Sequence, residues 1–372
     1  MLIGVPKEIK THEYRVGLTP AGVRELTHSG HKVLVETQAG AGIDFDDAAY
    51  RNAGADIAPD AETVFAKADM IVKVKEPQPV ECKRLREDQI LFTYLHLAPD
   101  PKQTQLLLES GAIAIAYETV TDNRGRLPLL APMSEVAGRM SIQAGAHSLE
   151  RAQGGRGMLL GGVPGVAPAH VVIIGGGVVG VNAARMAMGS GARVTILDKS
   201  IERLAELDNL YGPRLETLYS TVDSLETSVT EADLVIGAVL VPGAAAPKLV
   251  NRALLKKMRR GSVVVDVAID QGGCFETSRA TTHSDPIYIE EDVVHYCVAN
   301  MPGAVARTST LALTNATLPF VHALADKGYK QALADDPHLL EGLNVHRGDV
   351  TYEAVAQSLG LNYVSARDAI GL

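Results

Sequence analysis

The stretch HVVIIGGGVVGVNAA, residues 170–184, decides the fold that we expect for this chain. The run HVVII predicts a buried strand, and Gly175, Gly177 and Gly180 follow it as G-x-G-x-x-G at the start of a predicted helix. The first glycine permits a tight turn, the second lets a pyrophosphate approach the backbone, and the third lets helix and strand pack closely. The stretch therefore predicts a dinucleotide-binding turn at a helix N-terminus, although a tight turn that binds nothing is the alternative.

An acidic residue follows at the spacing that such a turn requires. The next predicted strand, residues 192–198, ends at Asp198, 18 residues after Gly180. A carboxylate there accepts hydrogen bonds from the ribose hydroxyls and repels a 2′-phosphate, which favours NAD over NADP. Lys199 and Arg203 lie nearby and weaken this preference.

Composition limits the classes of protein to consider. The chain has 372 residues, a formal net charge of −9 and three cysteines without a CxxC pair. This length suggests two domains, and the acidic balance makes nucleic acid an unsuitable partner. The odd, unpaired cysteines fit a reducing compartment, where we expect them to serve as packing residues.

Apolar strand-like runs alternate with helical segments, which predicts an α/β fold. We expect two Rossmann-like doubly wound parallel-sheet domains with a cleft between them. Residues 136–304 would form the NAD-binding domain with six strands, at 170–175, 192–198, 214–220, 233–240, 262–268 and 295–300. Residues 1–135 and 305–372 would form a discontinuous substrate domain, because the C-terminal part is mostly helical, has no sheet of its own to cover and would return to pack on the first domain.

No segment predicts export or a membrane span. The N-terminal MLIGVPKEIK reaches a proline and charges before an apolar run of signal-peptide length develops. Residues 157–184 carry no Asp, Glu, Lys or Arg, but Pro164, Pro168 and eight glycines make them a poor membrane helix. We therefore expect a cytoplasmic protein without a membrane partner.

Candidate chemistry gathers where predicted strands end. In ILFTYLH, residues 90–96, alternation places His96 at the end of a strand, where it could protonate a carbonyl or be a structural histidine. Asp270 follows the strand that contains the structural acid Asp266, and it could reach a ligand or cap a turn. Arg15 and Lys75 would suit a carboxylate clamp, with solvated surface charges as the alternative.

Several motifs together resemble the L-alanine dehydrogenase family, which shares its fold with the NAD(H)-binding part of proton-translocating nicotinamide nucleotide transhydrogenase. The resemblance covers nearly the whole chain. The motifs are GVPKEIKTHEYRVGLTP at 4–20, KVKEP at 73–77, YLHLAPD at 94–100, PMSEVAGRMSIQAGAHSLE at 132–150, the glycine-rich stretch 154–198, VDVAIDQGGCFETSRATTHSDPIY at 265–288 and NMPGAVARTSTLALTNATLP at 300–319.

The resemblance implies roles for individual residues. Arg15 and Lys75 match the residues that hold the substrate carboxylate, and His96 and Asp270 match the catalytic pair. Cofactor contacts are implied at Ser134, Gly175, Gly177, Val178, Val179, Gly180, Asp198, Arg203, Ser220, Val239, Leu240, Val267, Ala268, Ile269, Asp270, Arg279, Val298, Ala299, Asn300 and Met301.

The implied activity is NAD-dependent oxidative deamination of L-alanine to pyruvate and ammonium, in a homohexamer, without a metal. Two alternatives remain at this point. A transhydrogenase subunit would pass hydride to a partner nucleotide, but its chains commonly continue toward membrane helices. Another amino-acid dehydrogenase of the superfamily, such as one forming saccharopine, would need room for a larger substrate.

Overall fold

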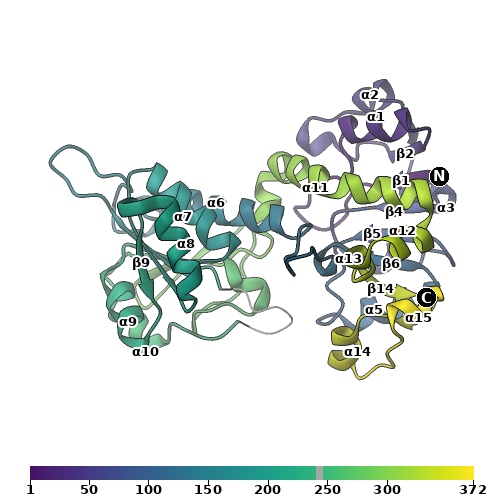
Figure 1. Ribbon diagram of the computed structural model, residues 1–372. Helices are drawn as coiled ribbons and strands as arrows, with labels where there is room; N and C mark the ends of the chain where they lie inside the picture. The colour runs from purple at the N-terminus through teal and green to yellow at the C-terminus, as the bar shows by residue number, and fades with distance from the viewer. Residues whose placement is uncertain (240–245) are drawn as a thin grey trace. The chain divides into compact units, whose positions relative to one another are not determined.

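The computed structural model describes residues 1–239 and 246–372. Contacts within the chain divide it into two compact units, one formed by Met1–Met133 and Val305–Leu372 and the other by Ser134–Ala304 (Figure 1). Both units are α/β structures in which helices cover a mostly parallel sheet. The expected α/β fold with two doubly wound, mostly parallel sheets is therefore confirmed.

The described residues of the first unit form an eight-stranded sheet in the order β15-β14-β6-β5-β4-β1-β2-β3. The strands β1 to β6 are parallel, and the order reverses at β1, which lies between β4 and β2. The strands are β1 (Leu2–Val5), β2 (Lys32–Glu36), β3 (Asp56–Ala58), β4 (Met70–Val72), β5 (Ile90–Thr93), β6 (Ile113–Ala116), β14 (Leu343–His346) and β15 (Asp349–Val350).

Helices of the first unit begin and end where capping residues predict. The Thr19 side chain accepts a hydrogen bond from Gly22 N at the start of α1, and Gly111 ends α5 in the left-handed region. The helices are α1 (Pro20–His28), α2 (Asp47–Asn52), α3 (Ala61–Lys67), α4 (Pro79–Cys82), α5 (Pro101–Ser110), α11 (Ala306–Lys327), α12 (Tyr329–Asp335), α13 (Pro337–Leu340), α14 (Glu353–Leu359) and α15 (Ala366–Ile370).

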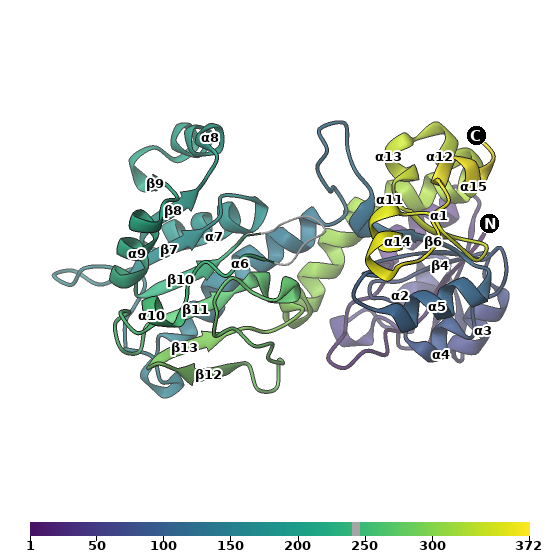
Figure 2. The same ribbon diagram turned by 90° about the horizontal axis from the view of Figure 1, so that it is seen from below.

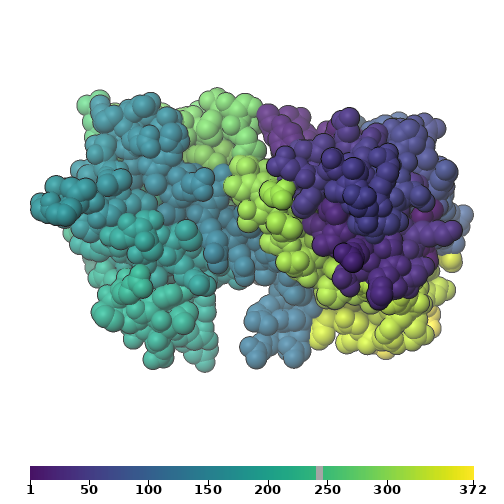
Figure 3. Space-filling view, turned by 90° about the horizontal axis from the view of Figure 1, so that it is seen from above, coloured from purple at the N-terminus to yellow at the C-terminus, as the bar shows by residue number. Residues whose placement is uncertain are grey.

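The C-terminal part of the chain returns to the first unit, where its residues lie against N-terminal ones (Figure 3). Helix α11 packs on α1 (Figure 1). The missing side chain of Gly22 leaves space for Thr314. This part is mostly helical, as expected, and it also adds β14, which pairs antiparallel with β6 and extends the sheet of the first unit. A tight turn at Arg347 and Gly348, both with positive φ, then leads into β15.

The described residues of the second unit form a seven-stranded sheet in the order β12-β13-β11-β10-β7-β8-β9 (Figure 2). The expected six strands omit β12, which pairs antiparallel with β13 through a turn at Glu291 and Asp292. The strands are β7 (His170–Ile174), β8 (Arg193–Asp198), β9 (Glu216–Tyr219), β10 (Leu234–Gly237), β11 (Val263–Asp266), β12 (Ile287–Glu290) and β13 (Val293–Tyr296).

Helices cover this sheet over an apolar core contributed by both faces of its central strands. Val171 and Ile173 of β7 belong to one core cluster, and Val172 and Ile174 belong to the other. The helices are α6 (Ala131–Ser148), α7 (Val178–Gly189), α8 (Ile201–Tyr211), α9 (Val222–Glu231) and α10 (Arg252–Leu255). Strand β7 lies between β10 and β8, which places the order reversal of a doubly wound sheet directly before Gly175.

Among the residues that the structure describes, no helix combines the length and apolarity needed to cross a bilayer.

Candidate active site

Loops that follow the parallel strands β1, β4, β5 and β6 share one edge of the first sheet, where doubly wound folds bind ligands. Arg15, Lys75 and His96 lie on the first three of these loops. The structure brings two of them onto one carboxylate oxygen: Oε2 of Glu76 lies 3.8 Å from Lys75 Nζ and 3.9 Å from His96 Nδ1.

Arg15 is a buried cation, with only 2% of its surface exposed. Its Nε and Nη2 donate to the two carboxylate oxygens of Glu13 at 2.7 Å and 2.6 Å, and Nη1 lies 3.1 Å from Sδ of Met133. Burial opposes the charge, but pairing with Glu13 raises the pKa of Arg15. The surface-charge alternative is therefore wrong for Arg15, whose guanidinium already binds a carboxylate through two hydrogen bonds.

The loop that carries Lys75 is held by a buried charge network. Oε1 of Glu8 accepts hydrogen bonds from the backbone N of Val74 and of Lys75, at 2.7 Å and 3.2 Å. Lys73 Nζ donates to Glu8 at 3.1 Å and to Glu81 at 2.7 Å. Burial raises the pKa of Glu8. Burial also opposes the positive charge of Lys73, but the two glutamates outweigh this effect and raise the pKa of Lys73. These contacts fix the backbone from which the Lys75 side chain extends.

His96 lies beyond the end of β5 at Thr93, so the alternation that placed it on the strand is wrong. Its φ of 49° is in the left-handed region, which few residues other than glycine adopt. The carboxylate of Glu118 stabilises this turn by accepting from the backbone N of Leu95 at 3.1 Å and of His96 at 2.6 Å. The imidazole stacks on Tyr94 at 5.7 Å and is 45% exposed, so it is available to a ligand.

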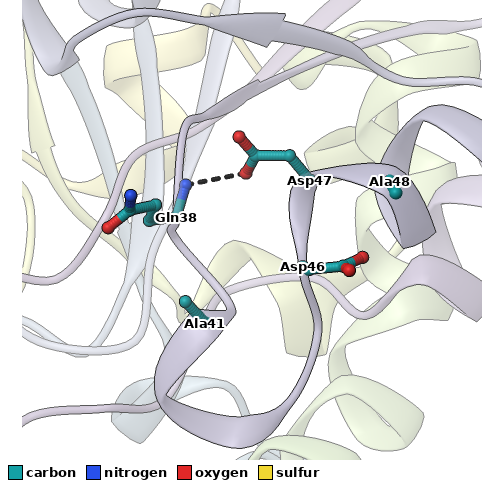
Figure 4. Close-up of a pocket in the computed structure, with 5 residues that line it drawn as sticks. All are labelled: Gln38, Ala41, Asp46, Asp47 and Ala48. Carbon is teal, nitrogen blue, oxygen red and sulfur yellow. Dashed lines mark hydrogen bonds between the residues drawn. The ribbon is translucent and has the colours of Figure 1, made fainter.

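A cavity of about 250 Å³ in the first unit is lined by other residues: Gln38, Ala41, Asp46, Asp47 and Ala48 (Figure 4). The backbone N of Gln38 donates to Asp47 Oδ1 at 2.8 Å, and Asp46 caps α2 through Ala49 N. Both acids therefore stabilise a turn and a helix end, and none of the predicted site residues lines this cavity.

The glycine turn of the second unit has the geometry that a dinucleotide requires. Gly175 has a φ of +105°, and a Cβ on Gly180 would lie 1.8 Å from the carbonyl oxygen of Gly175. A Cβ on Gly177 would meet nothing within 4 Å. Gly177 also begins α7 without a side-chain cap, and Val178 is 42% exposed. The turn thus combines a close helix–strand contact with open space before free helix N–H groups, which fits a pyrophosphate.

Asp198 ends β8 beside this turn. Its Oδ2 accepts from Gly176 N at 2.6 Å, and its Oδ1 accepts from Ser200 N at 2.8 Å. Arg203 Nε donates to the carbonyl oxygen of Gly176 at 2.7 Å, and its Nη1 donates to Glu206. The carboxylate therefore lies directly beside the glycine turn, and the nearby guanidinium is engaged by protein groups.

Asp270 is exposed within a 3₁₀ helix, Val267–Gln271, directly after β11. The buried Asp266 organises this loop by accepting from Ala268 N at 3.1 Å, Cys274 N at 2.9 Å and Ser278 Oγ at 2.5 Å. Burial raises the pKa of Asp266, although these hydrogen bonds oppose the shift. The structural role expected for Asp266 agrees with these contacts, and Asp270 extends from the segment that it fixes.

Most of the remaining predicted cofactor contacts follow other parallel strands at the same edge of the second sheet. Arg279 lies two residues before Thr281, which pairs with Val298 after β13, and its guanidinium is 3.9 Å from the centre of the Tyr288 ring. Leu240 is outside the described residues. Ser134 belongs to α6 and Val179 to α7. The others are Ser220 after β9, Val239 after β10, Val267, Ala268 and Ile269 after β11, and Val298, Ala299, Asn300 and Met301 after β13.

Sequence reasoning missed four glutamates at the edge of the first sheet. Glu8, Glu13, Glu76 and Glu118 contact the side chains or backbone of the predicted site residues. Three of them lie within eight positions of a predicted residue in the sequence, but they lie in loops, where spacing does not determine which groups meet. Glu118 gave no such signal, because its contact with His96 depends on the pairing of β5 with β6.

Family models match both parts of the chain. The model described as alanine dehydrogenase/PNT, N-terminal domain, matches residues 4–137, and the C-terminal domain model matches residues 141–353. Alanine dehydrogenase from Halomonas elongata is 65% identical over 100% of both chains. Alanine dehydrogenase from Bacillus subtilis is 56% identical over 100% of this chain and 98% of its own length.

Solved structures agree with these matches. A structure described as an L-alanine dehydrogenase has a TM-score of 0.94 and 55% identity, covering 97% of this chain and 99% of its own. A transhydrogenase from Sinorhizobium meliloti has a TM-score of 0.81 at 24% identity, which shows a shared fold. The two family models cover most of the sequence, and the relatives match along its full length. The chain therefore belongs to the alanine dehydrogenase/PNT family.

Proposed function

We propose that this chain is an NAD-dependent L-alanine dehydrogenase, which interconverts L-alanine with pyruvate and ammonium. The observation that carries the proposal is the full-length identity of 65% to a protein named alanine dehydrogenase. Support also comes from a buried arginine, a lysine and an accessible histidine on loops at one edge of the first sheet, and from the open glycine turn of the second unit.

Arg15 and Lys75 would hold the substrate carboxylate. A guanidinium carries five N–H donors, so an arginine that binds one carboxylate through Nε and Nη2 can still donate to a substrate from another N–H, and a lysine adds a compact charge. The fork of Arg15 is held by Glu13 at 2.6–2.7 Å, and the Lys75 backbone is held by Glu8. Such fixed cations would orient C2 of the substrate, on which hydride transfer depends.

His96 and Asp270 would move the protons. Oxidation removes a hydride from C2, water adds to the resulting iminium carbon, and ammonia leaves. A bound nicotinamide supplies the hydride acceptor in this direction and the donor in reverse. In reductive amination His96 would protonate the pyruvate carbonyl oxygen, and Asp270 would exchange protons with water and the amine.

NAD fits the residues around the glycine turn better than NADP. Asp198 offers a carboxylate where the ribose would lie, and Arg203 is occupied by Gly176 and Glu206 rather than presented to a 2′-phosphate. We also propose a homohexamer, as the family resemblance implies, in the cytoplasm, which the free, buried Cys82, Cys274 and Cys297 support. Analytical ultracentrifugation tests the assembly.

The activity test measures reduced-nicotinamide absorbance with L-alanine and NAD at alkaline pH, beside NADP, glycine, serine and lysine. We expect turnover with alanine and NAD, and its absence would refute the proposal. His96→Ala and Asp270→Asn should abolish turnover while NADH binding persists. His28→Ala and Asp208→Asn alter exposed residues of α1 and α8 and serve as matched controls.

A further inference from the structure

Glu76 has a buried carboxylate oxygen that the proposed mechanism does not use. Its side chain is 13% exposed, and Oε1 accepts a hydrogen bond from Lys10 Nζ. Oε2 has no hydrogen-bond partner among the residues that the structure describes. It lies 3.8 Å from Lys75 Nζ and 3.9 Å from His96 Nδ1, too far for hydrogen bonds.

The group is a carboxylate at neutral pH. Burial alone would raise its pKa, but the ammonium groups of Lys75 and Lys10 lower the pKa of Glu76 below its ordinary value. A buried charged oxygen without a hydrogen bond is costly, so such a group calls for a functional explanation. The two groups that lie within 3.9 Å of Oε2 in these ion pairs are Lys75 and His96, and the proposed function assigns both to the substrate.

We propose that Glu76 is a positioning residue that accepts a hydrogen bond from Nδ1–H of His96 during turnover. This inference rests on the proposed function, in which His96 donates a proton to the pyruvate carbonyl oxygen. A bond at Nδ1 directs Nε2–H toward the substrate, and the carboxylate stabilises the imidazolium before that proton leaves. The imidazole is 45% exposed, so it has room to close the gap of about 1 Å.

Other charged groups lie close to this pair. The ammonium of Lys75 lies 3.8 Å from Oε2 of Glu76, and the Glu118 carboxylate accepts a hydrogen bond from the His96 backbone N at 2.6 Å. Burial raises the pKa of the stacked Tyr94, which stays neutral. All of these groups persist when Glu76 alone is changed. Titratable groups around this site include Lys10, Lys75, Tyr94 and Glu118, and also Arg15, whose charge acts on Tyr94.

The first test is the pH profile of kcat/KM for pyruvate in Glu76→Gln and Glu76→Asp. The alkaline limb reports loss of the His96 proton, so removing the carboxylate should move it to lower pH by roughly 0.5–1.5 units. We expect Glu76→Gln to lower kcat about tenfold, and Glu76→Asp to restore the wild-type limb. Glu109→Gln, an exposed change on α5, is the matched control. An unmoved limb with a uniform loss of activity would indicate a purely structural role and overturn the proposal.

A second test does not depend on turnover. Diethyl pyrocarbonate modifies neutral histidines, and peptide mass spectrometry reads the pH midpoint of modification at His96. This midpoint should fall in Glu76→Gln by the same amount, and equal midpoints in the two proteins would overturn the inference. If the wild-type protein fails to oxidise alanine, the proposed function fails, but the midpoint still decides whether Glu76 acts on His96.

Discussion

Two glycines of the same turn should respond differently to the same substitution. A Cβ on Gly177 would meet nothing within 4 Å, and the residue has an ordinary φ of −69°. In Gly177→Ala, poorer helix capping destabilises the folded protein, whereas a less flexible unfolded chain favours folding. Because these effects oppose each other, the free energy of unfolding should change by less than about 1 kcal/mol. The methyl group would fill the space of the pyrophosphate, and NADH should bind about tenfold more weakly, or about 1.4 kcal/mol.

Gly180→Ala should damage both properties. Its Cβ would lie 1.8 Å from the Gly175 carbonyl oxygen, which is backbone and must move with the whole turn. Overpacking of this kind costs about 1–3 kcal/mol, or roughly 3–10 °C in the melting temperature, and NADH binding should be lost as well.

The assays are thermal unfolding without ligand and titration by NADH fluorescence. If Gly177→Ala binds NADH as the wild type does, the pyrophosphate does not approach this turn and our reasoning about the cofactor is refuted. Equal melting temperatures for Gly180→Ala and wild type would refute the packing argument.

Three further outcomes follow from the charged groups. Lys75→Ala should raise the KM for pyruvate by about tenfold or more, because a hydrogen bond to a charged group is lost, while the affinity for NADH stays unchanged. Lys102→Ala on α5 is the control. A KM equal to that of the wild type would show that Lys75 does not bind the substrate carboxylate. Lys73→Met should lower the free energy of unfolding by about 3–5 kcal/mol in urea, because two buried glutamates lose their cation, and a loss below 1 kcal/mol would contradict this role. Burial lowers the pKa of His295 in the folded protein below the ordinary value of 6.5. Just below pH 6.5 the histidine is therefore protonated in the unfolded chain but not in the folded one. The free energy of unfolding should decrease as the pH falls from 6.5 toward the folded-state pKa. In His295→Gln this pH dependence of the melting temperature should weaken, and an unchanged slope would point to other groups.

Features that depend on neighbouring residues in the sequence could be predicted, whereas features that depend on distant residues could not. The glycine turn, Asp198 and the capped helices α1 and α5 depend on neighbours in the sequence, and the structure places them as their patterns indicate. Strands β12, β14 and β15 escaped prediction, and all three pair antiparallel in sheets that are otherwise parallel. The turn before β13 uses Glu291 and Asp292 with positive φ instead of the Asn-Gly pair that marks most such hairpins.

The candidate site shows the same division. The positions of Lys75 and Asp270 just after strands could be read from the sequence, because strand ends are local features. The sequence could not show whether Arg15 is a surface charge. Its burial depends on a bidentate bond with Glu13 and on a contact with Met133, which is 118 residues away. Likewise, the left-handed turn at His96 depends on Glu118, which lies in the 3₁₀ helix Tyr117–Thr119 after the adjacent strand β6.

The return of Val305–Leu372 to the sheet begun by Met1–Met133 sets an order for biosynthesis. A ribosome adds roughly 5–20 residues each second, and domains generally fold as units while the chain emerges. Strand β6 must therefore wait, with its edge exposed, until the whole second unit and then β14 have been made. The part of the polypeptide synthesised first is the last to become native, and during that delay chaperones have their best opportunity to bind it.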